Sequence, residues 1–111
     1  MADPKKSILI TGCSSGIGHA VAHGMTERGW RVFATCRKPE DCGRLESEGL
    51  ESFPLDYDDP VSIQAALDEA LDRTGGTLDA LFNNGAYAVP GLLEDLPRDA
   101  LRANFETNFF G

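Results

Sequence analysis

The glycine-rich octet at residues 11–18 has the residue types and spacing to bind a phosphate-containing cofactor. It reads Thr-Gly-Cys-Ser-Ser-Gly-Ile-Gly and follows a short apolar run at residues 7–10. Gly12 can take the positive φ of a sharp turn, Gly16 lets the backbone approach a pyrophosphate, and Gly18 allows close packing. Free N–H groups and the dipole at the start of a following helix favour an anion. The octet therefore predicts dinucleotide binding by Gly12, Ser14, Ser15, Gly16, Ile17 and Gly18.

The spacing Gly-x-x-x-Gly-x-Gly distinguishes between classes of nucleotide-binding protein. It differs from the commoner Gly-x-Gly-x-x-Gly fingerprint and from the Walker pattern of P-loop NTPases. It also disfavours an adenosyl site like that of methyltransferases. The octet resembles the cofactor signature Thr-Gly-x-x-x-Gly-Ile-Gly of the short-chain dehydrogenase/reductase family. This resemblance implies a Rossmann-type fold and an oxidoreductase that uses a nicotinamide cofactor.

The residues about 20 positions after the octet indicate which nicotinamide cofactor is used. An acidic residue commonly closes the second strand there and binds the ribose 2′-hydroxyl of NAD. This chain has Cys36 at that position, followed by Arg37 and Lys38. A guanidinium without a neighbouring carboxylate favours a 2′-phosphate, so we predict NADP(H) bound by Arg37 and Lys38. The alternative is that the two cations are an ordinary solvated pair at the start of a loop.

Two further segments match the family in the cofactor half. The resemblance gives Asp56 the role of the aspartate that hydrogen-bonds adenine, although a turn or a helix cap is an equal alternative. Asp58 and Asp59 are better placed for capping. Residues 83–86 read Asn-Asn-Gly-Ala where the family has Asn-Asn-Ala-Gly. The resemblance implies that Asn83, Asn84 and Gly85 form a wall of the cofactor site.

The end of the chain resembles the family's fourth-helix motif, whose asparagine belongs to an Asn-Ser-Tyr-Lys catalytic group. Asn108 would be that asparagine and would act by holding the catalytic lysine through water; the alternative is an ordinary helix-surface residue. The family's tyrosine four residues before a lysine is missing, because Tyr57 is followed at that distance by Val61 and Tyr87 by Gly91.

Because the tyrosine and lysine are missing, the resemblance implies that residues 1–111 form a single truncated domain, the amino-terminal cofactor-binding part of a longer protein. We expect this part alone to be inactive. The predicted parent activity is hydride transfer between NADP(H) and an alcohol or ketone, a small-molecule substrate that only residues 86–96 of this chain could contact. The alternative is a noncatalytic dinucleotide-binding or redox-sensing module.

Strands and helices are predicted to alternate along the whole chain. The expected strands are residues 7–10, 30–36, 51–56 and 78–83. The expected helices run from about residue 15 to Gly29, over 39–48, from Asp59-Pro60 to Gly75-Gly76, and from about Pro97. This alternation predicts an α/β fold with a Rossmann-type doubly wound parallel sheet in the order 3-2-1-4. Ligands bind such sheets where the strand order reverses, here between the first and fourth strands.

Apolar residues four positions apart predict the faces that the helices turn toward the core. The predicted core stripes are Ile17, Val21 and Met25 in the first helix, with Ala20 and Gly24 beside them, and Ile63, Leu67 and Leu71 in the third, with Ala66 and Ala70 alongside. His19 and His23 also lie four apart on the first helix and could grip a metal. No third ligand is expected near them, so we interpret the pair as solvated surface and predict no metal site.

Composition limits the partners of the chain. Its 111 residues carry 10 Lys and Arg against 18 Asp and Glu, a net charge of −8, which disfavours binding to nucleic acid or an anionic membrane. Cys13, Cys36 and Cys42 match no zinc or Cys-x-x-Cys spacing and are predicted to be free thiols. No secretion signal or long apolar run is present, so the expected location is cytoplasmic. An open edge at residues 78–83 predicts a homo-oligomer.

Overall fold

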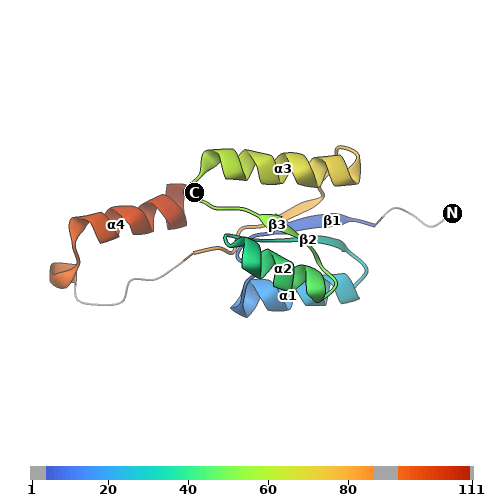
Figure 1. Cartoon of the computed structure of the whole chain (residues 1–111), viewed down its shortest axis with the longest axis horizontal. Coiled ribbons are helices and arrows are strands. Elements are labelled where there is room, and N and C mark those ends of the chain that lie inside the picture. The colour runs from blue at the N-terminus through green and yellow to red at the C-terminus, as the bar shows by residue number, and fades with distance from the viewer. Residues whose placement is uncertain (1–4, 87–92, 111) are drawn as a thin grey trace.

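The computed structural model describes residues 5–86 and 93–110, which form an α/β fold around one parallel sheet (Figure 1). The strands are β1 (Ser7–Ile10), β2 (Arg31–Cys36), β3 (Glu51–Pro54) and β4 (Ala80–Phe82). The α-helices are α1 (Gly16–Glu27), α2 (Pro39–Ser47), α3 (Pro60–Thr74) and α4 (Arg98–Phe105), with a 3₁₀ turn at Leu93–Asp95 and a π-helical turn at Glu106–Phe110. The parallel sheet has the order β3-β2-β1-β4, which confirms the predicted fold class.

The two faces of the sheet are covered by different helices, as Figure 1 shows. Alternate residues of β1 point to opposite faces, so Ile8 and Ile10 join a core with α1 and α2, while Leu9 joins a core with α3. Strands buried on both faces read as continuous apolar runs, as β1 does. The sheet thus holds its carboxyl ends in fixed positions between two layers of helix.

The small residues of α3 face the sheet more fully than the predicted stripe does. Ala66 and Ala70, predicted to lie alongside the stripe, are buried, whereas Leu67 is 38% exposed, so the prediction is wrong for Leu67 at the centre of the stripe. A methyl side chain lets the helix axis approach the sheet closely. The neighbouring Leu67 and Leu71 then lie at the sides of the helix and remain partly in solvent.

Helix α1 shows the same displacement of its buried face. Gly18 and Ala22 are its buried residues, and Val21 and Met25 pack beside them. Ile17 is 69% exposed and takes no part in the core, contrary to the predicted stripe. The buried face of α1 is therefore formed by the small residues Gly18 and Ala22, each of which directly follows one of the large apolar residues Ile17 and Val21.

The ends of α3 follow the predicted signals, while β4 is shorter than expected. Asp59 caps α3 by accepting a hydrogen bond of 3.0 Å from the N–H of Val61, and Gly75 ends the helix with φ of 81°. Strand β4 has three residues in place of the predicted segment 78–83. The Asp79 carboxylate accepts the Ser7 N–H at 2.8 Å, so a side chain replaces the strand's backbone acceptor there.

None of the helices among the described residues has both the length and the hydrophobicity needed to cross a bilayer. Cys13, Cys36 and Cys42 are free, as predicted, and all three are buried.

An ion cluster ties the amino ends of β2 and β3 to the end of α3. Arg31 donates two hydrogen bonds to the Glu51 carboxylate, at 2.9 and 3.0 Å, and one of 2.7 Å to the Arg73 carbonyl. Nη1 of Arg73 lies 3.4 Å from Oε1 of Glu51. The Arg31 hydrogen bonds hold the pKa of Glu51 below its ordinary value of 4.5, and partial burial opposes this shift.

We predict that Glu51→Gln destabilises the protein only at pH values where the carboxylate is ionised. Because the folded-state pKa is lowered, the stabilisation is complete above about pH 4.5 and is lost as the pH falls through the folded-state pKa. The Glu51 side chain is more than a third exposed, so the loss in the free energy of unfolding at neutral pH should be about 1 kcal/mol or less. Denaturant unfolding across pH 2–7 measures it, with Glu27→Gln on the exposed end of α1 as control. A penalty that persists at pH 2 would contradict the ionic explanation.

Candidate functional site

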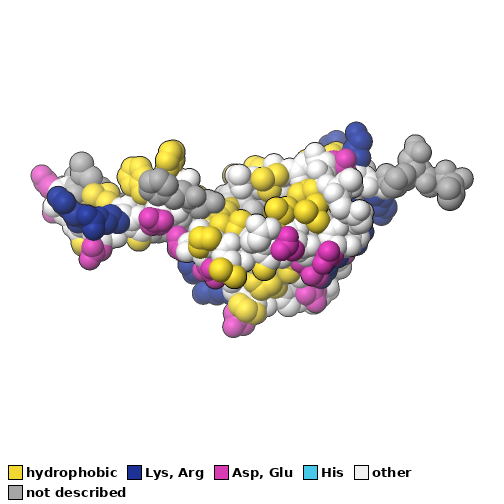
Figure 2. All heavy atoms as spheres, turned by 90° about the horizontal axis from the view of Figure 1, so that it is seen from above, with side chains coloured by type: hydrophobic (Ala, Val, Ile, Leu, Met, Phe, Trp, Pro, Cys, Tyr) yellow, Lys and Arg dark blue, Asp and Glu magenta, His cyan; other side chains and the backbone are white. Residues whose placement is uncertain are grey.

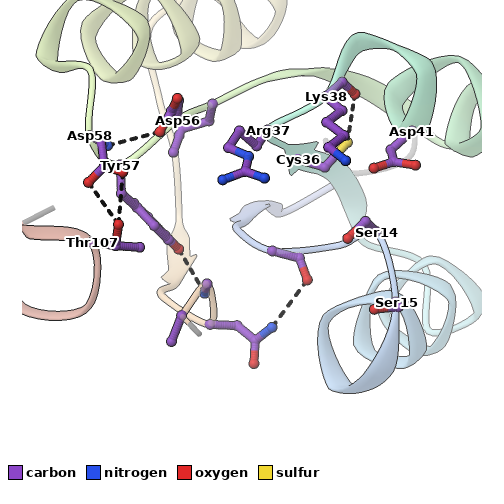
Figure 3. A pocket seen from close by; sticks show the side chains of 15 residues that line it. Ser14, Ser15, Cys36, Arg37, Lys38, Asp41, Asp56, Tyr57, Asp58 and Thr107 are labelled. Atoms are coloured by element: carbon purple, nitrogen blue, oxygen red, sulfur yellow. Dashed lines mark hydrogen bonds between the residues drawn. The ribbon is translucent and has the colours of Figure 1, made fainter. Parts of the chain in front are cut away.

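A cavity of about 680 Å³ lies at the carboxyl ends of the strands, where the sequence places the cofactor site (Figure 3). Its walls come from the loops after β1, β2, β3 and β4 and from the turn that follows α4. The predicted cofactor-binding residues that line it are Gly12, Ser14, Ser15, Arg37, Lys38, Asp56, Asn84 and Gly85. Those that do not line it are Gly16, Ile17, Gly18 and Asn83, and the predicted catalytic Asn108 also lies outside its lining.

The glycine turn is packed too tightly for side chains at two of its positions. Gly12 has φ of 68°, and a methyl group on it would lie 2.8 Å from the Gly85 Cα. A methyl group on Gly18 would collide with the Gly12 carbonyl and with Asn84. The glycines therefore allow the turn to lie directly against the loop that follows β4.

The middle glycine of the turn, Gly16, faces open space instead. Gly16 has φ of 64°, and no atom lies within 4 Å of where its side chain would be. It begins α1, whose first-turn N–H groups have no partners inside the helix, and Ser15 makes no side-chain cap. This arrangement fits an incoming phosphate, which would take those N–H groups as donors. The exposed Ile17 side chain next to it points outside the cavity lining.

Contacts behind the turn hold its backbone in place. The Cys13 N–H donates to the Thr35 carbonyl at 3.0 Å, and Arg44 of α2 donates to the Ser14 carbonyl. The Cys13 thiol is fully buried and donates to the Ile10 carbonyl at 3.3 Å. Burial raises the pKa of this thiol to about 11, so it stays protonated and acts as a small core residue.

Thr11 connects three of the loops that form the cavity, although the sequence analysis assigned it no role. Its buried hydroxyl accepts hydrogen bonds from the Asn84 N–H at 2.9 Å and from the Tyr57 hydroxyl, and donates to the Phe82 carbonyl. It also shares the Gly85 N–H, at 3.2 Å, with the Tyr57 oxygen, which lies closer at 2.7 Å. The Asn84 side chain adds a hydrogen bond of 3.3 Å to the Gly12 carbonyl. Thr11 and Asn84 together fix the glycine turn against the end of β4.

Tyr57 is a second residue that the sequence analysis missed as part of the site. Its ring lies where a side chain at position 85 would be, and its hydroxyl accepts the Gly85 N–H at 2.7 Å. Gly85 has no positive φ, so the need for glycine here is one of space. This explains the sequence Asn-Asn-Gly-Ala: glycine at position 85 makes room for the ring. A glycine in that unusual place was the available signal for a bulky neighbour.

The residues after β2 divide between the core and the cavity. Arg37 is exposed, and in Figure 3 its side chain extends into the space between Asp56 and Ser14. Cys36, the last residue of β2, also lines the cavity, but it is only 2% exposed and its Sγ lies 3.0 Å from the Sγ of Cys42 in α2, so its thiol belongs to the core. Burial, the largest cause, and the Cys42 hydrogen bond raise the pKa of the Cys36 thiol.

The charges around Arg37 are mixed. Lys38 is the N-cap residue of α2, and Asp41 in the first turn of that helix also lines the cavity. The sequence analysis did not assign Asp41. Its carboxylate lies 3.9 Å from Arg44, which moderates its negative charge at this wall.

Asp56 takes part in a turn, one of the two roles considered for it. Its Oδ1 accepts the Asp58 N–H at 3.0 Å, and its own N–H donates to the Ser62 hydroxyl at 3.0 Å. The residue also lines the cavity, so adenine contact remains a prediction alongside the turn.

The far wall is closed by the turn that follows α4. The Thr107 hydroxyl donates to the Asp58 carboxylate, with oxygen distances of 2.7 and 2.9 Å, and both residues line the cavity. Asn108 is the next residue and is exposed, within the π-helical turn. Asn83 is also exposed. Tyr87 and the rest of 87–92, within the segment predicted to contact substrate, lie outside the described residues.

Comparison with known proteins gives consistent matches. The family described as short chain dehydrogenase matches residues 6–111. An uncharacterized oxidoreductase, YbbO, of Escherichia coli (strain K12) is 41% identical over 107 residues, covering 96% of this chain and 40% of that protein. An NADPH-dependent 1-acyldihydroxyacetone phosphate reductase of Schizosaccharomyces pombe is 34% identical, covering 98% of this chain and 37% of that protein.

Among solved structures, an actinorhodin polyketide ketoreductase determined with NADPH superposes with a TM-score of 0.84 at 27% identity. The match covers 94% of this chain and 42% of that one. The chain thus spans about 40% of the length of the curated relatives it matches.

We predict that Gly85→Ala destabilises the protein by about 1–3 kcal/mol because the new methyl group displaces the Tyr57 ring. The penalty should be much smaller in a Tyr57→Ala background, since the ring is then absent. A double-mutant cycle measured by denaturant unfolding gives the coupling energy, expected to be at least about 0.5 kcal/mol.

Gly43→Ala is the matched control for this cycle, because nothing lies within 4 Å of a methyl group at that position inside α2. It should be neutral or stabilising. Equal effects of Gly85→Ala with and without the Tyr57 ring would refute the steric explanation.

Proposed function

The chain belongs to the short chain dehydrogenase family, and we propose that it provides the NADP(H)-binding part of an oxidoreductase acting on an alcohol or ketone. The observation that carries this proposal is the cavity, which has Ser14 and Ser15, just before α1, on one side and the Arg37 side chain on the other. The relative named as an NADPH-dependent reductase and the ketoreductase solved with NADPH support the choice of cofactor.

The cavity residues fit the parts of a dinucleotide. The N–H groups of the turn at Ser14, Ser15 and Gly16 would bind the pyrophosphate. Arg37, with Lys38 beside it, would pair with the 2′-phosphate through charge-assisted hydrogen bonds. Other lining residues would then bind the uncharged parts of the cofactor. Asp56 and Leu55 would contact the adenine, and Asn84 and Gly85 would contact the side of the cofactor that faces β4.

The bound cofactor would supply the hydride, while the protein supplies position and electrostatics. Asn108 and Asn83 keep their proposed roles as a positioning residue for a catalytic lysine and as part of the wall; both are exposed here. General acid and base groups for the carbonyl are proposed to come from outside this chain, because neither Tyr57 nor Tyr87 is followed by lysine four residues later. Without them, roughly 10²–10⁴-fold in rate would be missing.

A noncatalytic dinucleotide-binding or redox-sensing role is the second candidate, and the close Cys36 and Cys42 thiols are the observation that bears on it. Burial raises the pKa values of Cys13 and Cys36, which makes thiolates scarce and oxidation slow. The catalytic proposal is therefore favoured. NADPH-dependent turnover of ketones by the whole protein would distinguish the two roles.

The free thiols also support a reducing, cytoplasmic location.

Self-association is proposed for the open side of the sheet. Strand β4 pairs only with β1 among the described residues, and Leu81 in it is 57% exposed. Phe105 and Phe109 are 57% and 74% exposed, and hydrophobic atoms are visible on the surface from the α3 side in Figure 2. Exposed apolar area of this kind favours contact with another protein surface, here a second copy. The net charge of −8 disfavours nucleic acid as the ligand.

We predict that Arg37→Ala weakens NADP⁺ binding about ten- to a hundredfold and leaves NAD⁺ binding nearly unchanged, because one charge-assisted contact to the 2′-phosphate is lost. Arg37→Asp should go further and favour NAD⁺, since a carboxylate there repels the 2′-phosphate and can accept a ribose hydroxyl. Calorimetric titration of both cofactors into the whole protein measures this.

The control is Arg28→Ala, which removes the same charge from the end of α1, outside the cavity lining. It should leave both affinities unchanged. Equal losses for NAD⁺ and NADP⁺ in Arg37→Ala would contradict recognition of the 2′-phosphate by this side chain.

A further inference from the structure

Three potential metal ligands meet on the surface between α1 and α2, away from the cofactor cavity. His19 and His23 lie one turn apart on α1, and Glu48 is the C-cap residue of α2. One ring nitrogen of each histidine and a carboxylate oxygen of Glu48 lie within 4.8 Å of one another. The expectation that no third ligand lies near the histidine pair is therefore wrong, because packing of α1 beside α2 brings Glu48 from 25 residues further along the chain.

We propose that His19, His23 and Glu48 bind a divalent transition metal of the zinc type. Two imidazole nitrogens and one carboxylate oxygen match the protein ligands of four-coordinate zinc sites that leave one position to water or another ligand. The proposal is independent of the proposed oxidoreductase function, since it uses none of the residues that line the cavity.

Side-chain torsions alone can bring the three groups around an ion. Each Nε2 lies 2.6 Å from Glu48 Oε1, and the two rings are edge to face with centroids 4.8 Å apart. Zinc bonds of about 2.1 Å at tetrahedral angles separate ligand atoms by roughly 3.4 Å. Binding therefore requires the Glu48 oxygen to withdraw by about 1 Å and the two imidazole nitrogens, which lie within 4.8 Å of each other, to settle at about 3.4 Å through side-chain torsions. Each histidine side chain is more than a third exposed, so an ion can enter from solvent.

The two helix backbones that present these ligands are well fixed. Glu48 donates its backbone N–H to the carbonyls of Arg44 and Leu45 at the end of α2, and the neighbouring Leu45 and Leu50 are buried. Helix α1 is held by the buried residue Ala22, between the two histidines. A metal would therefore bind a site already assembled by packing, which lowers the ordering cost of binding.

The charges near the cluster favour monodentate binding by Glu48. Its second oxygen, Oε2, lies 4.0 Å from Arg44 Nε, while Oε1 faces the imidazoles. Arg44 also donates to the Ser14 carbonyl of the glycine turn. The Arg44 cation reduces affinity for a second cation, and it also holds the carboxylate in the orientation that presents one oxygen.

Titration of the whole protein with Zn²⁺ and with Co²⁺ tests the proposal. We expect one saturable ion per chain, a rise in Tm on binding, and visible Co²⁺ bands of a nitrogen and oxygen site without near-ultraviolet thiolate charge transfer. Glu48→Gln, His19→Asn and His23→Asn should each weaken binding by at least about tenfold. The matched control Glu46→Gln removes the same charge two residues away and should bind normally.

Circular dichroism and Tm establish that each variant is folded. If Glu48→Gln does not fold, NMR of the unmodified protein decides, because metal binding should shift the ring resonances of His19 and His23 together. Failure to saturate, normal binding by folded Glu48→Gln, thiolate bands in the Co²⁺ spectrum, or unshifted histidine rings would each overturn the site.

Discussion

The buried hydroxyl of Thr11 is the contact on which the geometry of the cavity depends. It stands at the end of β1 and joins the loops that follow β3 and β4 through the hydrogen bonds from Tyr57, Asn84 and Gly85. A buried donor that loses its acceptor costs about 1–3 kcal/mol, so these loops are held to one arrangement. The glycine turn, which packs on Asn84 and Gly85, inherits that arrangement. One side chain thus aligns three walls of the proposed cofactor site.

Tyr57 and Gly85 show how a change in a local motif can be compensated within the same site. The family that this chain resembles has alanine where Gly85 stands, and the ring of Tyr57 fills the space that the alanine methyl would occupy. The ring also gives the loop after β3 a hydrogen bond to Thr11 and receives one from Gly85. The two residues are therefore best understood as a pair, since the tyrosine needs the glycine for space and the wall keeps its contacts.

The order of the strands and the position of the glycine turn were predictable because their signals are local or topological. Alternating strands and helices with right-handed crossovers leave few parallel arrangements, and 3-2-1-4 is the one observed. Contacts that depend on how two helices pack were not predictable. Glu48 meets His19 and His23 only because small residues such as Ala22 let α1 lie close to the sheet beside α2. The same closeness explains why alanines, and not Leu67, form the centre of the α3 face.

The period of the strand explains why cofactor selection is expected at position 37 and not at position 36. Val32, Ala34 and Cys36 share one face of β2 and enter the core beneath α1 and α2. A carboxylate at position 36 would have to lie beside Cys42, where desolvation would raise its pKa and oppose its charge. Arg37 is the first residue beyond the strand and is free of this alternation, so its side chain extends into the cavity. We therefore propose that the residue after β2 supplies the polar group that meets the ribose 2′ position in this chain.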